Sequence, residues 1–583
     1  MVTDNKYFLL LKSWCDRIIE NQITQMKDPA FFGGVMCPAC SMIHGRIGDS
    51  VYPLTAMYAY TGDERYLNAA KLVVRWSESN VRRSHGGYFN DKLNFWIGIS
   101  VFSSISYGET LLHHADVLDD DTRREWSDIH KRITDFVREK FTEPGFHNNA
   151  NYFASYCAAM AIAYKLTGDE KYACSGRDMA KYFRENHITD DYLIKGEGNF
   201  FAPSPKGLYG IDIGYNVEES IPALTAYAHY MDDADYMELC IKLWESHLEL
   251  MIPDGAWDNS TGSRHNKWTY YGSRTSDGAT VGLCYIWRRS PVFAEAMERN
   301  FELMRSCSRD GYLYGGGMYI EAGEEPCLHH SFAHAKSLAA MLDCGFVHTE
   351  AVDLPRDREY GLRHVDSMGI DLVSVGDYRA TVSGYDAYHH AGSCTTGGSI
   401  TLLWNKRVGP IFASTMYEYL RAEPYNMQLS RNTDIIPCLT PRIDNNKYSS
   451  VNCTDVIVES EGCDNCVAIN ARGVLRDSAF RGEGEYSIDY SFGEDAIRIS
   501  AVSTVGGELI LPVICGADGA LSITDHTAHL TRACGTVTVK SDSEIVCKDG
   551  EEHAFNPVGG FVASILRIRM ECNKPVNVTL SVK

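Results

Sequence analysis

The 583-residue sequence lacks a hydrophobic run long enough to cross a membrane, and it lacks an excess of positive charge. A membrane-spanning helix needs about 20 consecutive apolar residues, so we expect no membrane segment. Asp and Glu outnumber Lys and Arg by 77 to 55, which gives a formal net charge of −22. Because nucleic-acid binding depends on the neutralisation of phosphates, this balance excludes nucleic acid as a partner. An anionic ligand requires a local cluster of cations.

The sequence also shows no secretory signal. The apolar run 8–11 is short and is followed by Lys12 and Asp16. The 19 cysteines are an odd number and are scattered through both halves of the chain. Free thiols in a chain without a signal are typical of a reducing compartment. We therefore expect a cytoplasmic protein.

The stretch from Pro253 to Gly278 has little that could form an apolar core and no helical period. It holds three cations, a histidine and four aromatic residues: Arg264, Lys267, Arg274, His265, Trp257, Trp268, Tyr270 and Tyr271. Long irregular segments in compact domains are usually functional or disordered, and this one is too aromatic for disorder. We interpret it as the wall of a pocket that stacks on, and pairs with, an anionic sugar. A surface loop held by its own salt bridges is the alternative.

Residues 1–352 have the pattern of paired helices. The segment 59–66, AYTGDERY, recurs as KLTGDEKY at 165–172, with a weaker copy at 229–236. Each copy places a short polar turn between an Ala-rich helix and a helix that starts with an aromatic residue. The spacing predicts about six helical hairpins. They are expected to close into an (α/α)6-type toroid with a central cleft, and an open solenoid is the alternative.

Residues 353–583 have a different pattern. Short alternating runs rich in β-branched residues are separated by Gly, Asn and Asp. The runs that we expect to be strands are 399–404, 451–459, 485–490, 496–502, 508–513, 536–540 and 562–569. This spacing is typical of an antiparallel β-sandwich.

The segment 146–156, FHNNANYFASY, runs directly into an Ala-rich helix. Its polar residues His147, Asn148, Asn149 and Asn151 are therefore expected at a helix N-terminus, where backbone N–H groups favour an anion. Asn side chains also donate to a carboxylate, and Tyr152 is a further candidate for substrate contact. Helix capping is the alternative, but capping explains one Asn and not several beside a His.

The segment 210–220, GIDIGYNVEES, precedes another apolar helix. Tyr215, directly after a glycine, is a candidate for the reacting tyrosine. Glu218 and Glu219 are explained as well by the helix dipole as by chemistry. A third segment, 328–336 or LHHSFAHAK, places His330 and His334 on one helix face. Without the glutamate of an HExxH motif, His330 is better interpreted as a proton-transfer or carboxylate-neutralising group than as a metal ligand. A structural histidine pair is the alternative.

Cys37 and Cys40 form a CxxC motif with His44 close behind. A structural zinc site normally needs four ligands, and the sequence offers no convincing second half, so we predict no metal and no cofactor. His44 and Arg46 are instead candidates to face the cleft. His389, in the first strands of the second domain, is a candidate to close the cleft from the other side.

Helical hairpins followed by a β-rich half that starts with His389-His390…Gly392-Ser393 resemble the heparinase II/III-like group of polysaccharide lyases. That resemblance implies a toroid joined to a β-sandwich, and β-elimination at a uronic acid. It also implies that Asn149 binds the uronate carboxylate, that Tyr215 or Tyr271 is the tyrosine, and that His330 is the later histidine. Ala150 stands where several members of the group carry a catalytic His.

The sequence therefore predicts a uronate-specific lyase. Hydrogen bonds or cations on the carboxylate stabilise the developing enolate, a role suited to Asn149, Arg274 and His330. A base removes the C5 proton and an acid protonates the leaving oxygen, a role suited to Tyr215, Tyr271 or His147. The expected partner is an anionic uronate oligosaccharide, since a cytoplasmic address favours short imported chains.

Two other functions stay open. A glucuronidase-type hydrolase would pair Asp258 with Glu218 or Glu219 and hold the sugar carboxylate with Arg264, Lys267 or Arg274. A non-catalytic sugar-binding protein needs no titratable cluster beside its aromatic residues. The sequence leaves the sugar, the linkage, endo or exo action and the oligomeric state open, a homo-oligomer included.

Overall fold

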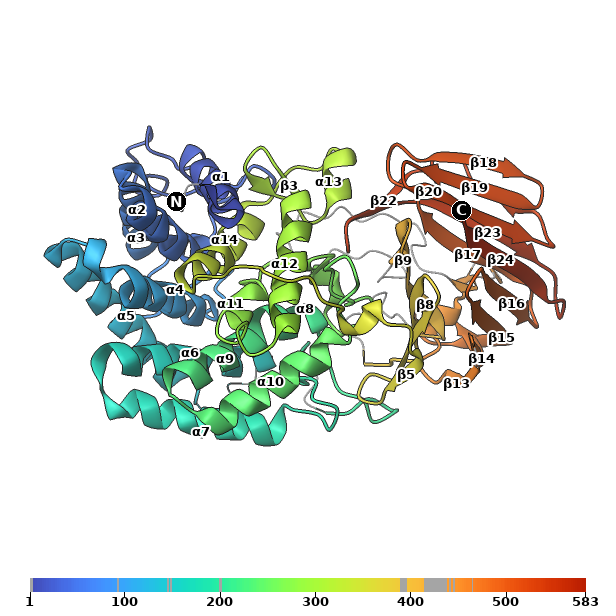
Figure 1. Ribbon diagram of the computed structural model, residues 1–583, viewed down its shortest axis with the longest axis horizontal. Helices are drawn as coiled ribbons and strands as arrows, with labels where there is room; N and C mark the ends of the chain where they lie inside the picture. The colour runs from blue at the N-terminus through green and yellow to red at the C-terminus, as the bar shows by residue number, and fades with distance from the viewer. Residues whose placement is uncertain are drawn as a thin grey trace.

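The computed structural model describes residues 4–91, 94–143, 146, 149–198, 202–387, 396–413, 438–439, 442–443, 446–463 and 465–583. Three predicted substrate or catalytic residues, His147, Asn148 and His389, lie outside the described residues. Figure 1 shows two parts side by side, with the helices of the first half of the chain on the left and the sheets of the second half on the right.

The first part is built from helices. Their bounds are α1 (Lys6–Glu20), α2 (Val51–Thr61), α3 (Glu64–Asn80), α4 (Ile99–His114), α5 (Asp120–Lys140), α6 (Ala150–Thr167), α7 (Glu170–Asn186), α8 (Ile213–Tyr215), α9 (Ile221–Tyr230), α10 (Ala234–Leu248), α11 (Thr280–Leu283), α12 (Pro291–Ser306), α13 (Gly317–Glu321) and α14 (Leu328–Asp343). Three short helical turns also matter for the site: η2 (Gly45–Ser50), the π-helical η4 (Asn216–Ser220) and η5 (His265–Lys267).

The repeated Thr-Gly-Asp turns join helices into hairpins as predicted. After α2, Gly62 has a left-handed φ of 69°, and after α6, Gly168 has a φ of 68°. Glycine adopts this conformation without a Cβ penalty and ends the helix. The following Asp63 and Asp169 then cap α3 and α7 by accepting backbone N–H groups. Adjacent residues alone therefore specify this turn.

The hairpins close into a toroid because the last inner helix meets the first. Helix α14 packs against both α1 and α2. Inner helices are buried on all sides, and every residue of α6 from Ala150 to Ala163 is buried. Outer helices such as α5 are amphipathic, with a charged outer face. Among the described residues, no helix has the combination of length and apolarity that a bilayer-spanning segment requires.

The second part is built from strands. The longer ones are β5 (Gly361–Val365), β6 (Ile370–Val375), β7 (Tyr378–Ser383), β8 (Ser399–Asn405), β9 (Gly409–Ala413), β13 (Ile457–Cys463), β14 (Cys466–Arg476), β15 (Gly482–Gly493), β16 (Ile497–Ser503), β17 (Gly507–Ile514), β18 (Ala520–Thr524), β19 (Thr527–Arg532), β20 (Gly535–Ser541), β23 (Phe561–Met570) and β24 (Val576–Val582). The short ones are β10 (Cys438–Leu439), β11 (Arg442–Ile443), β12 (Asn446–Lys447), β21 (Ile545–Val546) and β22 (Ala554–Asn556). Two small hairpins, β1 (Trp268–Thr269) with β2 (Gly272–Ser273) and β3 (Ser308–Arg309) with β4 (Tyr312–Leu313), come earlier in the chain, before α14.

These strands form antiparallel sheets. One follows the order β5-β6-β7-β8-β9, a second the order β13-β14-β15-β16-β24-β20-β19-β18, and a third the order β10-β17-β23-β21 with β22 beside β23. Faces of all three contribute to one apolar core. The run predicted as a strand at 451–459 begins as a 3-10 turn at Ser450–Asn452, and the strand itself starts at Ile457.

The aromatic and cationic stretch 253–278 lies between the two parts. All residues from Gly255 to Arg274 are buried. The stretch contains η5 and the small hairpin β1–β2, and Gly559 of the second part donates its N–H to the carbonyl of Trp268 at 3.0 Å. The surface-loop alternative is therefore wrong, because this stretch is an internal wall.

Candidate active site

A cavity of about 360 Å³ opens within the helical part. Its lining residues are His44, Arg46, Asn90, Asn94, Trp96, Phe102, Asn151, Tyr152, Tyr215, Glu219, Arg264, Lys267, Thr275 and His329. This mixture of aromatic faces, amides and cations is suited to an anionic sugar, which needs both stacking and charge.

The three segments singled out in the sequence meet in this cavity. The start of α6 supplies Asn151 and Tyr152, the turn before α9 supplies Tyr215, and the buried stretch supplies Arg264 and Lys267. Each comes from the N-terminal end of an inner helix or from the wall beside it, so the toroid brings them together although they are distant in sequence.

Tyr215 lies at the centre of the cationic side. Its hydroxyl shares a 2.8 Å hydrogen bond with that of Thr275 and accepts one from Lys267 Nζ at 3.1 Å. The guanidinium of Arg264 covers the Tyr215 ring at 4.5 Å, and Arg264 is itself held by Glu197 at 3.3 Å. Positive charge on two sides of a phenol stabilises the phenolate that forms when the hydroxyl gives up its proton.

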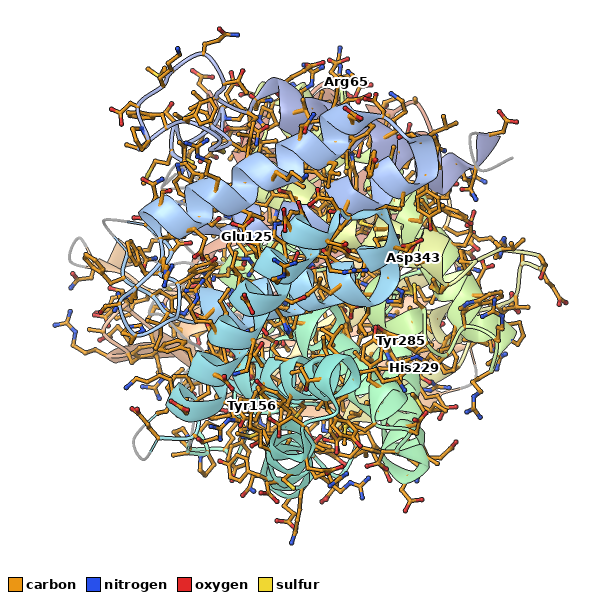
Figure 2. All side chains as sticks on the ribbon, turned by 90° about the vertical axis from the view of Figure 1, so that its left-hand side faces the viewer. Arg65, Glu125, Tyr156, His229, Tyr285 and Asp343 are labelled. Carbon is orange, nitrogen blue, oxygen red and sulfur yellow. The ribbon has the colours of Figure 1, made fainter. Side chains whose placement is uncertain are left out.

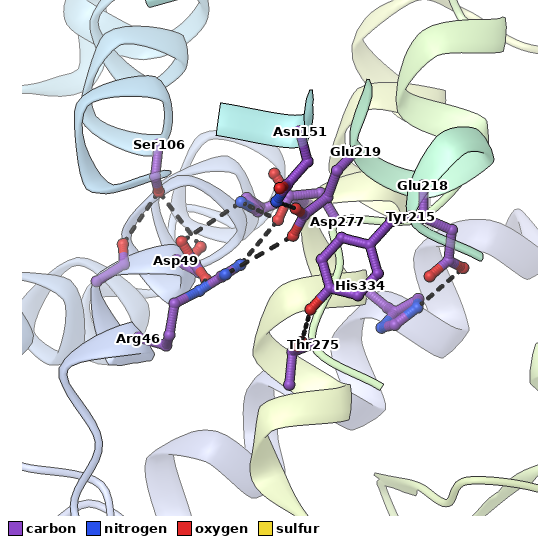
Figure 3. A network of polar contacts seen from close by, with 12 residues as sticks. Arg46, Asp49, Ser106, Asn151, Tyr215, Glu218, Glu219, Thr275, Asp277 and His334 are labelled. Atoms are coloured by element: carbon purple, nitrogen blue, oxygen red, sulfur yellow. Dashed lines mark hydrogen bonds and ion pairs between the residues drawn. The ribbon is translucent and has the colours of Figure 1, made fainter. Parts of the chain in front are cut away.

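Glu219 lies on the wall next to Tyr215 (Figure 3). It accepts a 2.6 Å hydrogen bond from the Asn151 amide and lies 3.8 Å from Arg46. Burial raises the pKa of Glu219 to about 8, against the opposing attraction of Arg46. At neutral pH this side chain is therefore largely a neutral acid, able to donate a hydrogen bond to a carboxylate.

Arg46 is held in place by acids from other elements. It pairs with Asp49 of its own 3-10 turn and with Asp277 at 3.1 Å. Lys336 of α14 also reaches Asp277, at 2.7 Å. The network joins η2, the end of the buried stretch and α14 (Figure 3).

A histidine pair forms another part of the wall. The rings of His44 and His329 lie 3.7 Å apart between centroids. Desolvation lowers the pKa of His329 well below its usual range, and its buried Nε2 has no hydrogen-bond partner among the described residues. A neutral imidazole of this kind can accept a proton from a substrate.

The chain is similar to known proteins over nearly its whole length. Residues 11–357 match the family model of the ulvan lyase N-terminal domain, and residues 362–583 match that of the ulvan lyase C-terminal domain. A broad-specificity ulvan lyase from Formosa agariphila is 36% identical over 589 residues, covering 96% of this chain and 91% of the relative. The chain belongs to the ulvan lyase family.

Solved structures show the same architecture at low sequence identity. Heparinase III is 12% identical with a TM-score of 0.57, over 91% of this chain and 76% of that one. The chondroitin AC lyase of Streptomyces coelicolor A3 is 13% identical with a TM-score of 0.56, over 99% of this chain and 80% of that one. The predicted toroid and β-sandwich, the resemblance to polysaccharide lyases and the prediction of a lyase are confirmed.

Two predicted catalytic residues of this ulvan lyase family member form a buried pair away from the cavity lining. The Tyr271 hydroxyl and His330 Nδ1 share a 2.6 Å hydrogen bond, and both side chains are buried. Burial and the nearby Arg274 lower the pKa of His330 well below its usual range. The structural interpretation of His330 fits this position better than a role at the substrate carboxylate.

The carboxylates proposed for hydrolysis are not brought together. Glu218 points away from the Arg46 network toward His334, at 3.2 Å (Figure 3). Asp258 pairs instead with Arg356 at 3.1 Å, where the two parts of the molecule meet. Among the described residues that line the cavity, Glu219 alone carries a carboxylate, so the expected Asp258–Glu218 or Asp258–Glu219 pair does not exist.

Trp268 and Tyr270 belong to a core and not to the cavity. They pack with Trp404 and Phe561 of the second part. Tyr270 donates to Asp254 at 3.0 Å. The prediction that these two residues stack on the sugar is wrong, because they pack against apolar partners from strands far along the chain.

The remaining predicted residues support the wall from behind. Asn149 is the residue before α6, and its side chain accepts the Gly198 N–H at 3.2 Å. His265 bonds the carbonyl of Gly262, and Arg274 donates to the carbonyl of Asn266 at 2.8 Å. None of the three is among the cavity-lining residues in the described part of the chain.

Sequence reasoning missed the amide and aromatic side of this ulvan lyase family site. Asn90, Asn94, Trp96 and Phe102 come from the segment around the start of α4, which carries no repeat and no charged cluster. Asn151 stood in the Asn-rich segment, although its neighbour Asn149 was the favoured carboxylate ligand. Their contacts separate them, since Asn149 accepts the Gly198 N–H whereas Asn151 lines the cavity.

A second cavity of about 290 Å³ opens at the opposite end of the helical part. Figure 2 views this end, with Asp343, Tyr285 and His229 close together near the middle. Their polar atoms are largely engaged with one another and with neighbours. Asp343, for example, accepts a 2.6 Å hydrogen bond from Tyr52. We assign the active site to the first cavity, where Tyr215 lies beside the cations Arg264 and Lys267 and shares the cavity lining with amide groups.

Proposed function

We propose that the protein cleaves ulvan or a closely related uronate-containing polysaccharide by β-elimination in the cavity around Tyr215. Family membership over nearly the whole chain supports the reaction. The observation that carries the site assignment is the meeting of Tyr215, Lys267, Glu219 and Asn151 on one cavity.

The uronate carboxylate must be neutralised before its C5 proton can leave. Asn151 and the protonated form of Glu219 provide hydrogen bonds for this, with Arg46 behind them. These donors stabilise the negative charge that grows on the carboxylate as the enolate forms. A neutral Glu219 is essential here, since an ionised one would repel the substrate.

Tyr215 is our choice for proton transfer. Lys267 contacts its hydroxyl and Arg264 covers its ring, which places two cations beside the oxygen that would accept the C5 proton. The same hydroxyl can then return the proton to the leaving oxygen at C4. His329, neutral and facing the cavity, is the second candidate for the base.

Steady-state assays with ulvan test the proposal. Elimination produces a C4–C5 double bond conjugated with the carboxylate, which absorbs in the ultraviolet, whereas hydrolysis produces reducing ends without that absorbance. We expect absorbance and reducing ends to rise together with ulvan, and no reaction when its uronates have been reduced to neutral sugars. Reducing ends without absorbance would exclude elimination and favour a hydrolase.

The proposal extends to substrate size and location. We expect short ulvan oligosaccharides to be cleaved at least as fast as the polymer, in keeping with the cytoplasmic location expected from the free cysteines. Kinetics on size-fractionated ulvan and fractionation of the source cells test the two points separately.

A further inference from the structure

A cluster of thiols lies directly behind the active-site wall. The ligating atoms of Cys37, Cys40 and His44 all lie within 4.8 Å of one another, and Cys40 Sγ is 2.9 Å from His44 Nε2. The thiol of Cys327, at the start of α14, is hydrogen-bonded to that of Cys37. All three cysteines are free thiols in this structure.

We propose that Cys37, Cys40, His44 and Cys327 form a structural zinc site that joins the N-terminal loop to the start of α14. Tetrahedral zinc with Zn–S bonds of about 2.3 Å and Zn–N bonds of about 2.0 Å sets its ligand atoms roughly 3.5–3.8 Å apart. The ligating atoms of Cys37, Cys40 and His44 match this spacing in scale, and Cys327 adjoins them through its hydrogen bond with Cys37. Three sulfurs and one imidazole are a known structural zinc set, and the group contains no carboxylate that would favour calcium or magnesium.

The burial of the cluster agrees with a metal. Cys37 and Cys327 are only 1% and 3% exposed. Several thiolates buried together repel one another unless a cation neutralises them, and zinc binding releases the thiol protons.

The position of the cluster indicates its role. His44 is the residue before η2, which carries Arg46, and Cys327 is the residue before α14, which carries His329. A metal would therefore join the first and last inner segments of the toroid where they meet, and would fix two elements that line the cavity. Four protein ligands leave no open position for substrate or water, so the site is structural and His329 remains outside the ligand set.

Metal content tests the site without an activity assay. Protein purified without added metal should contain about one zinc per chain by mass spectrometry. Cys37→Ser and Cys327→Ser should each lower the zinc content at least about tenfold, since loss of one thiolate ligand weakens binding strongly. Cys174→Ser, at an exposed cysteine of α7, is the matched control and should keep its zinc.

A cobalt spectrum covers the case in which the variants do not fold. Wild-type protein produced in cobalt-supplemented medium should show sulfur-to-cobalt charge transfer and the intense d–d bands of tetrahedral Co²⁺. An octahedral spectrum, a metal-free protein with all thiols alkylatable, a disulfide among the three cysteines, or zinc loss in Cys174→Ser would each overturn the proposal.

Discussion

The hydroxyl of Tyr215 is the single atom on which the proposed chemistry depends. Replacement by Phe keeps the ring beneath Arg264 but removes the group that Lys267 and Thr275 contact. We expect Tyr215→Phe to lower kcat about 10²–10⁴-fold, the range for loss of a general acid–base group, with little change in KM. Ultraviolet-monitored elimination of ulvan measures both constants.

Tyr271→Phe is the matched control for that variant. It removes the hydroxyl of another buried tyrosine, one that bonds to His330 and does not line the cavity. We expect a stability loss of about 1 kcal/mol and kcat within a few-fold of wild type. Equal losses of kcat in Tyr215→Phe and Tyr271→Phe would contradict the assignment of proton transfer to Tyr215 alone.

Glu219 predicts a pH dependence with a defined sign. Its pKa is raised to about 8 by burial, so the neutral, active form is lost as pH rises through about 8 and kcat/KM should fall there. Between pH 4.5, the ordinary pKa of a glutamate, and about pH 8, Glu219 is protonated in the folded state but ionised in the unfolded chain. Glu219 therefore makes the free energy of unfolding fall as pH rises through that range.

Glu219→Gln keeps a hydrogen-bond donor without the titration. We expect its kcat/KM to stay level through the alkaline fall seen in wild type, and its Tm to depend less on pH between about 5 and 8. If kcat/KM of Glu219→Gln still fell at alkaline pH as it does in wild type, the fall would belong to another group.

At the scale of elements, the π-helical turn η4 decides which side chains face the cavity. Tyr215, directly before this turn, and Glu219, within it, line the cavity, while Glu218 of the same turn faces His334. Asn216 holds the turn by donating to the Ile194 carbonyl at 3.0 Å and contacting His247 at 3.1 Å. Such π turns inside helices are often found at functional sites.

Asn216→Ala tests the turn. Loss of its amide leaves a buried carbonyl without its donor, which costs about 1–3 kcal/mol, and lets Tyr215 move from its cationic neighbours. We expect kcat to fall more than ten-fold at temperatures where the variant is folded. Asp63→Ala, which removes a helix cap far from the cavity at a cost of about 0.5–2 kcal/mol, should leave kcat unchanged. Chemical unfolding and kinetics on both variants give the comparison.

The elements that sequence predicted well are those specified locally. The Gly62 and Gly168 turns with their Asp caps need only adjacent residues, and their repetition predicted the toroid. Trp268 was misassigned because its neighbour Phe561 comes from the other half of the chain. The same limit hid Cys327, the third thiol of the cluster at Cys37, since nothing near Cys327 in the sequence indicates a partner until α14 meets the N-terminal loop.

At the scale of the whole molecule, the second part stabilises the active-site wall from behind. Asp258 and Arg356 form a fully buried ion pair at 3.1 Å, and the Thr381 hydroxyl of β7 also donates to Asp258. Arg356 donates further to the Ala380 carbonyl at 3.0 Å. Because Asp258 belongs to the same buried stretch as Arg264 and Lys267, the β-sandwich helps to hold the cations beside Tyr215.

A double-mutant cycle tests this coupling. Arg356→Met leaves Asp258 buried without its cation, which should cost about 3–5 kcal/mol. Asp258→Leu alone leaves Arg356 in the same condition, whereas the double variant replaces the pair by apolar groups and should lose much less than the sum of the two singles. Urea unfolding followed by Trp fluorescence measures the four states. Strictly additive losses of stability would mean that the two side chains act independently. If the activity of Arg356→Met fell only in proportion to its folded fraction, the β-sandwich would not be needed to position Lys267.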